Sequence, residues 1–106
     1  MAAANEAQRN ADPYVAIRAN FLLGTVLRQR GQVRDALAHL DASLAWASTN
    51  GLRGFAASIQ AERAQSLAAD NRLNDAATVA RAALAFFEAQ QVRDPAEGIL
   101  RRLAAP

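Results

Sequence analysis

The stretch that decides the fold is Leu23-Gly24-Thr25-Val26-Leu27-Arg28-Gln29-Arg30-Gly31-Gln32-Val33-Arg34-Asp35-Ala36-Leu37. It predicts a helix that ends at Gly31, because glycine readily forms the left-handed cap that closes a helix. A second helix is expected to begin just after this turn. The small residues Gly24 and Ala36 would let the two helices approach closely. The stretch therefore indicates an antiparallel helical hairpin.

The same pattern occurs again forty residues later in the chain. Gly24 recurs as Ala64, Leu27 as Leu67 and Ala36-Leu37 as Ala76-Ala77, and Leu44, just after the stretch, recurs as Leu84. Repetition at a fixed period of about 20–50 residues is typical of folds in which similar units stack on one another. We therefore expect a solenoid of about two helical hairpins.

The composition favours an all-α fold. Of the 106 residues, 52% are hydrophobic, and alanine alone accounts for 28. Alanine has the highest intrinsic helix propensity. The few β-branched residues do not alternate with polar ones, as a half-buried strand would require. We expect residues 1–106 to form one domain, either complete in itself or part of a larger array.

Caps and turns give the expected helix boundaries. Asp12-Pro13 predicts a helix start, with aspartate as the N-cap and proline in the first helical position. Asp94-Pro95 repeats that pattern. In the second unit, Asp70-Asn71 occupies the position of the turn at Gly31. Long helices are expected over residues 13–30, 33–48, 53–69 and 73–90. A capping helix is expected to end near residue 104, and a short helix to cover residues 2–10.

These positions resemble the tetratricopeptide repeat family. The first unit matches its pattern at Leu23-Gly24, Leu27, Gly31, Ala36, Leu40 and Ser43, and the second at Ala64, Leu67, Asn71, Ala76, Ala80 and Ala83. Three residues depart from it: Asn20 and Arg63 replace large apolar residues, and Ala80 replaces an aromatic residue or leucine. The period of forty exceeds the family's basic period of about 34. It resembles the longer-helix variety found in large bacterial signalling and transcription-activator proteins.

The resemblance implies a non-enzymatic module that binds a protein or peptide partner in a concave groove lined by the first helix of each hairpin. Successive residues of a helix are rotated by about 100°, so one arc of the first helix combines aromatic residues and arginines. Tyrosine and arginine are enriched at binding hot spots. This arc carries Tyr14, Arg18, Phe21, Thr25 and Arg28, and the third helix adds Ser58, Glu62 and Gln65.

Other interpretations of the same residues remain open. Tyr14 and Phe21 could instead pack against residues 2–10. The first helix is apolar over most of its circumference, so it could also form a homodimer. The alternative function is a regulatory, ligand-sensing segment of a bacterial signalling or transcription regulator, in which a small ligand or an intramolecular partner fills the groove.

Catalysis, metal binding and a cofactor are not expected. His39 is the one histidine and the chain has no cysteine, so a nucleophilic or metal-binding constellation is hard to assemble. We expect His39 to be a partly buried or rim residue, because it lies between Ala36 and Ser43 on the second helix and its counterpart in the second unit is Val79.

The charge and apolar patterns also bear on partners and compartment. The net charge is only +2. The pI is nevertheless about 10.4, because all twelve basic residues are arginine, which keeps its charge up to very high pH. The cluster Arg28, Arg30 and Arg34 is too short to follow a nucleic-acid backbone, so a nucleic-acid partner is not expected. No apolar run approaches the roughly 20 residues that cross a bilayer. Without a secretory signal or cysteine, a cytoplasmic location is expected.

Overall fold

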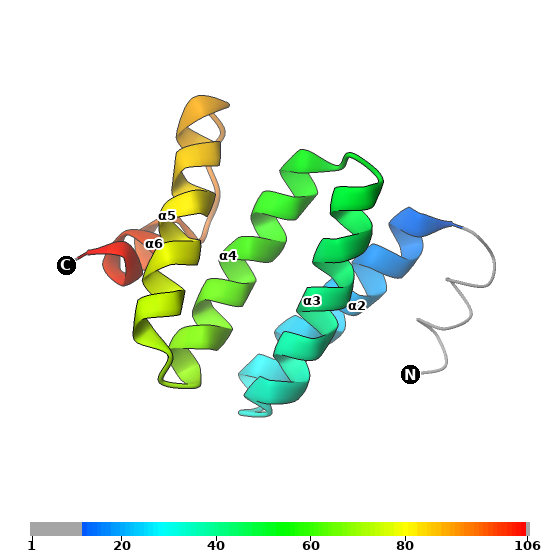
Figure 1. Cartoon of the computed structure of the whole chain (residues 1–106), viewed down its shortest axis with the longest axis horizontal. Helices are drawn as coiled ribbons and strands as arrows, with labels where there is room; N and C mark the ends of the chain where they lie inside the picture. Colours follow the sequence, from blue (N-terminus) through cyan, green and yellow to red (C-terminus); the bar gives the residue numbers. More distant parts are fainter. Residues whose placement is uncertain (1–11, 106) are drawn as a thin grey trace.

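A computed structural model describes residues 12–105 of the chain. This part contains the helices α2 (Pro13–Gln29), α3 (Val33–Thr49), α4 (Arg53–Ala69), α5 (Leu73–Ala89) and α6 (Glu97–Ala104). Helices that follow one another in the sequence pack side by side, and they form a row from the α2–α3 hairpin to α6 (Figure 1). The expected all-α fold of helical hairpins with a terminal helix is confirmed. The short helix expected over residues 2–10 lies outside the described residues.

The four long helices repeat with a step of twenty residues. Each has 17 residues, and each ends in a turn with one residue at positive φ: Gly31 (81°), Gly51 (69°), Asn71 (61°) and Gln91 (55°). In every turn two amides bond back to carbonyls of the last helical turn, as Gly31 N does to Arg28 O at 2.9 Å. This is the Schellman motif. The forty-residue unit is therefore two similar helix-and-turn steps.

Most helix boundaries differ from the expected ones by one residue at most, but the start of α6 differs more. Asp12 is confirmed as an N-cap, because its Oδ1 accepts a hydrogen bond from Val15 N at 3.3 Å. Asp94 does not cap α6, whose N-cap is Ala96. Its Oδ1 accepts from Ala96 N at 2.8 Å, only two residues away. That geometry is an Asx turn, so a turn precedes the helix and α6 begins at Glu97.

Close packing of α2 against α3 depends on Gly24. A Cβ atom at this position would lie 2.7 Å from Leu40 Cγ and 3.3 Å from Ala36 O, so the expected need for a small residue is confirmed. Ser43 is a further small residue of α3 that matches the repeat pattern. It is fully buried, and its Oγ donates to Ile17 O at 2.8 Å. Ser43 therefore joins α3 to α2 within the first hairpin.

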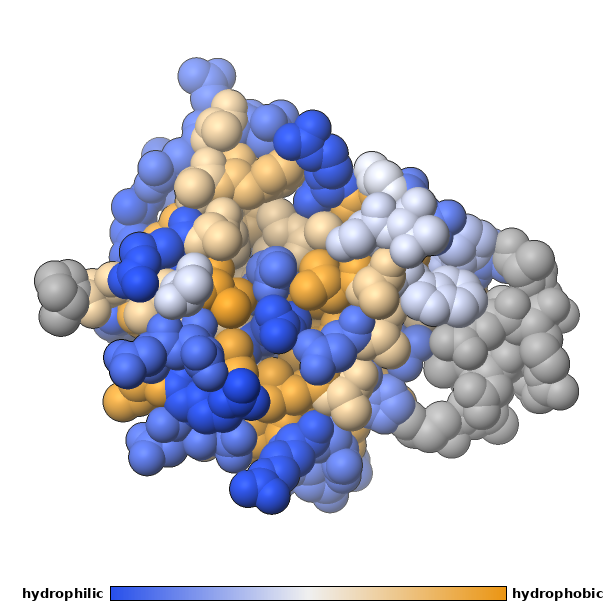
Figure 2. All heavy atoms as spheres, viewed as in Figure 1, coloured by the Kyte–Doolittle hydropathy of each residue, from blue (hydrophilic) through white to orange (hydrophobic). Residues whose placement is uncertain are grey.

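The core consists of small apolar clusters that join neighbouring helices. One cluster joins α2, α3 and α4 through Ile17, Leu40, Ala47 and Ile59. Another joins α4, α5 and α6 through residues that include Ala64, Ala80, Leu84, Phe87 and Leu100. Figure 2 shows hydrophobic residues, with some hydrophilic ones among them, in the middle of the face viewed there. The hairpins are thus held to each other as well as internally.

The departures from the repeat pattern are accommodated locally. Asn20 is buried, and its Nδ2 donates to Ala16 O at 3.0 Å. Arg63 on α4 pairs with Asp41 on α3 at 2.9 Å, so these polar residues at positions usually apolar have polar partners. Ala80 is fully buried in the cluster that contains Leu100.

Candidate functional site

The aromatic residues of the α2 arc contact an aromatic residue of α4. The rings of Tyr14 and Phe55 are 5.5 Å apart in an edge-to-face arrangement, and those of Phe21 and Phe55 are 5.7 Å apart in the same arrangement. This geometry is favourable for aromatic pairs. Tyr14 nevertheless remains half exposed. The aromatic pair of the predicted site therefore belongs partly to the interface between the two hairpins.

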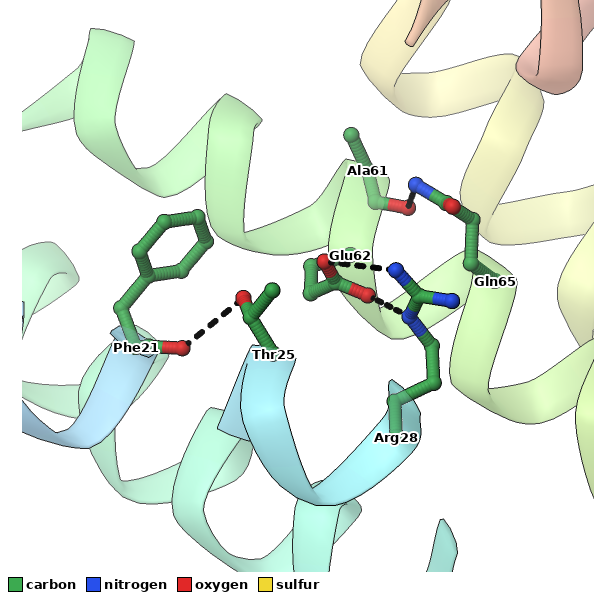
Figure 3. Close-up of polar contacts among 6 residues, drawn as sticks. All are labelled: Phe21, Thr25, Arg28, Ala61, Glu62 and Gln65. Carbon is green, nitrogen blue, oxygen red and sulfur yellow. Dashed lines mark hydrogen bonds and ion pairs between the residues drawn. The ribbon is translucent and has the colours of Figure 1, made fainter. Parts of the chain in front are cut away.

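Arg28 and Glu62, both predicted partner contacts, bind each other. Arg28 Nε pairs with one carboxylate oxygen of Glu62, and Arg28 Nη2 donates to the other at 3.4 Å (Figure 3). Glu62 is 7% exposed, and its burial is tolerable because the guanidinium neutralises it. The pair links α2 to α4 a few turns away from the aromatic contact.

Thr25 and Gln65 bond to the backbones of their own helices. Thr25 Oγ1 donates to Phe21 O at 3.1 Å, and Gln65 Nε2 donates to Ala61 O at 3.4 Å. Gln65 lies beside the guanidinium of Arg28 (Figure 3). Arg18 is exposed. Four of the eight predicted residues, Thr25, Arg28, Glu62 and Gln65, therefore lie together.

Ser58 lies in a different place, an open hollow of about 360 Å³ between α4, α5 and the segment that leads to α6. Two aromatic residues, Phe86 and Phe87, are part of its lining, and their rings are in edge-to-face contact at 6.1 Å. Polar and charged residues line it as well. The full lining is Arg53, Gly54, Ser58, Phe86, Phe87, Gln90, Val92 and Asp94.

Sequence reasoning missed two parts of this arrangement, Phe55 and the residues that α5 and the segment after it contribute to the hollow. Phe55 could have been found from its spacing, since Phe55, Ile59 and Glu62 follow the i, i+4, i+7 pattern of one helix face. Phe86 is the counterpart of Trp46 in the second unit, and this equivalence favours packing between hairpins over a place in a binding site. The contribution of Gln90 and Val92 had no signal in the sequence, because it depends on how the segment after α5 turns.

His39 occupies the partly buried position expected for it. Its Nδ1 lies 3.0 Å from Asn20 Oδ1. Asn20 uses its amide nitrogen to donate to Ala16 O, so its oxygen accepts the Nδ1–H of His39. Burial lowers the pKa of His39, and the negative charge of Asp35 partly offsets this effect. The imidazole therefore favours its neutral form.

The described helices offer neither a metal site nor a membrane span. Within residues 12–105, no group of three or more histidine, aspartate or glutamate residues could hold a metal ion. None of the helices α2 to α6 combines the length and the apolar character that a membrane-spanning helix needs.

Comparisons with known proteins do not connect this chain to a family. A scan against protein-family models, a search of curated proteins and a search of solved structures each found no match. The function proposed for the chain therefore depends on the contacts between α2 and α4 and on the hollow beside Ser58.

Proposed function

We propose that this chain is a non-enzymatic, tetratricopeptide-like module that binds a segment of another protein. The observation that supports the proposal best is the hollow beside Ser58, which lies between α4, α5 and the segment leading to α6 and is lined by aromatic, polar and charged residues. Protein-binding surfaces usually combine apolar and polar residues.

The chemistry of the hollow indicates the kind of segment that would fit. Phe86 and Val92 offer an apolar surface for one anchoring side chain, whereas Phe87 is only 3% exposed. Arg53 and Asp94 in the lining carry opposite charges, and Ser58 can donate or accept a hydrogen bond. We therefore expect a short peptide or helix with one large apolar residue flanked by polar ones.

The α2 residues have two different roles in this proposal. Tyr14 and Arg18 are exposed and would extend the contact surface. Arg28 and Glu62 satisfy each other, so they would set the spacing of α2 and α4 and would not bind the partner directly. Phe21 would act in the same way through Phe55.

A peptide selection tests the proposal. Random peptides displayed on phage would be selected on the wild-type chain, and the affinity of the selected peptides would be measured by fluorescence anisotropy. Ser58→Arg should weaken binding by tenfold or more, because the long side chain enters the hollow. Ala82→Arg is the matched control, since Ala82 is an exposed position of α5 outside the hollow. Equal affinity for wild type and Ser58→Arg would refute the hollow as the site.

The size of the hollow supports a second candidate, a regulatory segment that senses a small ligand. About 360 Å³ falls within the usual range for small-molecule sites, about 300–1,000 Å³. A thermal-shift screen of small metabolites would test this candidate. A hit should raise the melting temperature of wild type and of Ala82→Arg, and it should have no effect on Ser58→Arg.

A further inference from the structure

One face of α2 is exposed although it is apolar. Val15, Leu22 and Val26 are 47%, 47% and 43% exposed. Ala19 lies among them, and the spacing of these four residues places them along a single stripe of a helix. We call Val15, Ala19, Leu22 and Val26 the α2 stripe. It lies outside the arc that carries Phe21 and Arg28.

The internal repeat shows what this face does in the next unit. Forty residues on, the α2 stripe corresponds to Phe55, Ile59, Glu62 and Ser66 on α4. Ile59 and Ser66 are fully buried and Glu62 is 7% exposed. Ile59 packs in the cluster with Ile17 and Leu40. On α4, therefore, this face docks on the preceding hairpin.

The two ends of the row of helices differ in this respect. At the α5 end, α6 packs over the hairpin, and its Leu100 is fully buried (Figure 1). At the α2 end, Val15, Leu22 and Val26 are exposed in the part of the chain that the structure describes. Moving apolar side chains out of water lowers the free energy. The α2 stripe is therefore suited to be an interaction surface.

The α2 stripe of one copy is complementary to the α2 stripe of a second copy that runs in the opposite direction. Read in reverse, the α2 stripe places Val15 against Val26 and Ala19 against Leu22. The same reversal places Asp12 at the start of α2 against Arg30 at its end, and both are exposed. Asp12 and Arg30 are also eighteen residues apart, which is five turns of an α-helix, so they lie on the same side of α2.

We infer that the α2 stripe is the interface of a homodimer in which the α2 helices of two copies pack antiparallel. Its twofold axis passes near the middle of α2, between Ala19 and Leu22. Valines pack at both ends of the apolar contact, and Asp12 of each copy lies opposite Arg30 of the other. Such a contact is isologous, because each copy uses the same residues. This inference does not depend on the proposed peptide site, because none of the four residues of the α2 stripe lines the hollow beside Ser58.

Sedimentation velocity of the full chain over a concentration series tests the dimer. The average mass should rise with concentration from 11.3 kDa towards twice that value. Leu22→Asp should hold the chain at monomer mass, because two carboxylates would meet near the axis. Leu73→Asp is the matched control, since Leu73 is 58% exposed on α5, and it should dimerise like wild type. Circular dichroism should show that both variants remain folded.

Cysteine cross-linking tests the orientation of the helices. The natural chain contains no cysteine, so introduced thiols report without background. When Val15→Cys and Val26→Cys proteins are mixed and oxidised, the mixed disulfide should form well above its statistical share. A preference for the two like-with-like products would overturn the antiparallel arrangement.

Three other results would overturn the dimer itself. They are a chain that stays monomeric at every concentration, a dimer that Leu22→Asp leaves unchanged, and a monomer that Leu22→Asp unfolds. The last result would mean that another part of the same chain covers the stripe.

Discussion

The guanidinium of Arg28 on α2 binds the buried carboxylate of Glu62 on α4, and this ion pair joins the two hairpins. Both residues have the chemistry of partner contacts when the sequence is considered alone. In the folded chain each is the other's partner. Substitutions at either position therefore report on the packing of α2 against α4 as well as on any binding.

Removing only the arginine should destabilise the fold. Arg28→Met would leave the Glu62 carboxylate buried and uncompensated, so we expect the free energy of unfolding to fall by about 2 kcal/mol. The double variant Arg28→Met/Glu62→Leu should recover most of this loss, because no charge then remains buried. Urea denaturation followed by circular dichroism measures both effects.

The exposed pair Arg72–Asp75 provides the control for that experiment. Its side chains are more than half exposed, so Arg72→Met should change the free energy of unfolding by less than about 1 kcal/mol. If Arg28→Met costs no more than Arg72→Met, the ion pair between the hairpins contributes no more than a surface pair.

Gly24→Ala should separate α2 from α3. The added methyl would overlap Leu40, and overpacking of this kind costs about 1–3 kcal/mol, more than the roughly 1 kcal/mol gained in helix propensity. Thermal melting should show a lower midpoint. Gly54→Ala is the control, because a Cβ there meets no atom within 4 Å, and its midpoint should stay level or rise. A higher midpoint for Gly24→Ala would contradict the close contact.

Gln91→Gly should stabilise the chain. Gln91 has a φ of 55°, a conformation that costs an L-residue about 1 kcal/mol or more and costs glycine little. The free energy of unfolding should therefore rise by about 1 kcal/mol. Gln91→Ala keeps the steric cost and should be close to wild type. Gly31→Ala should show the opposite sign, and a stabilised Gly31→Ala would argue against the shared turn geometry.

His39 should make stability depend on pH. Its pKa in the folded chain is below its ordinary value because of burial, so at pH values near and below about 6.5 the unfolded chain binds more protons. The free energy of unfolding therefore falls as the pH is lowered through this window, and the full contribution is present above it. Denaturation at pH 7.5 and pH 5 measures the difference, which His39→Gln should reduce. An unchanged difference in His39→Gln would assign the effect to other groups.

The repeat itself could be predicted from the sequence because it depends on local chemistry. Gly31 and Asn71 tolerate the left-handed turn, and Asp12-Pro13 starts a helix, wherever they occur in a chain. Gln91 shows the limit of this reasoning. Its side chain does not favour the left-handed turn, so only its place twenty residues after Asn71 indicates the conformation it adopts.

For the eight predicted contact residues, the sequence predicted the helix and the face but not the residues that lie opposite them. Their helices were correct, and the α2 arc does lie against α4. Spacing along a helix gives the direction of a side chain, but it does not say what lies opposite. Phe55 lies opposite Phe21, and Glu62 lies opposite Arg28. Whether these residues bind a partner stays a prediction.

The sequence by itself determined the helices, their turns and their pairing into hairpins, because these follow from propensity, caps and a periodic apolar pattern over neighbouring residues. Only the tertiary structure decided which polar and aromatic residues satisfy one another, where the hollow beside Ser58 opens, and which face of α2 is exposed. These features depend on the distance and angle between hairpins. That geometry is set by the packing of side chains that lie far apart in the chain.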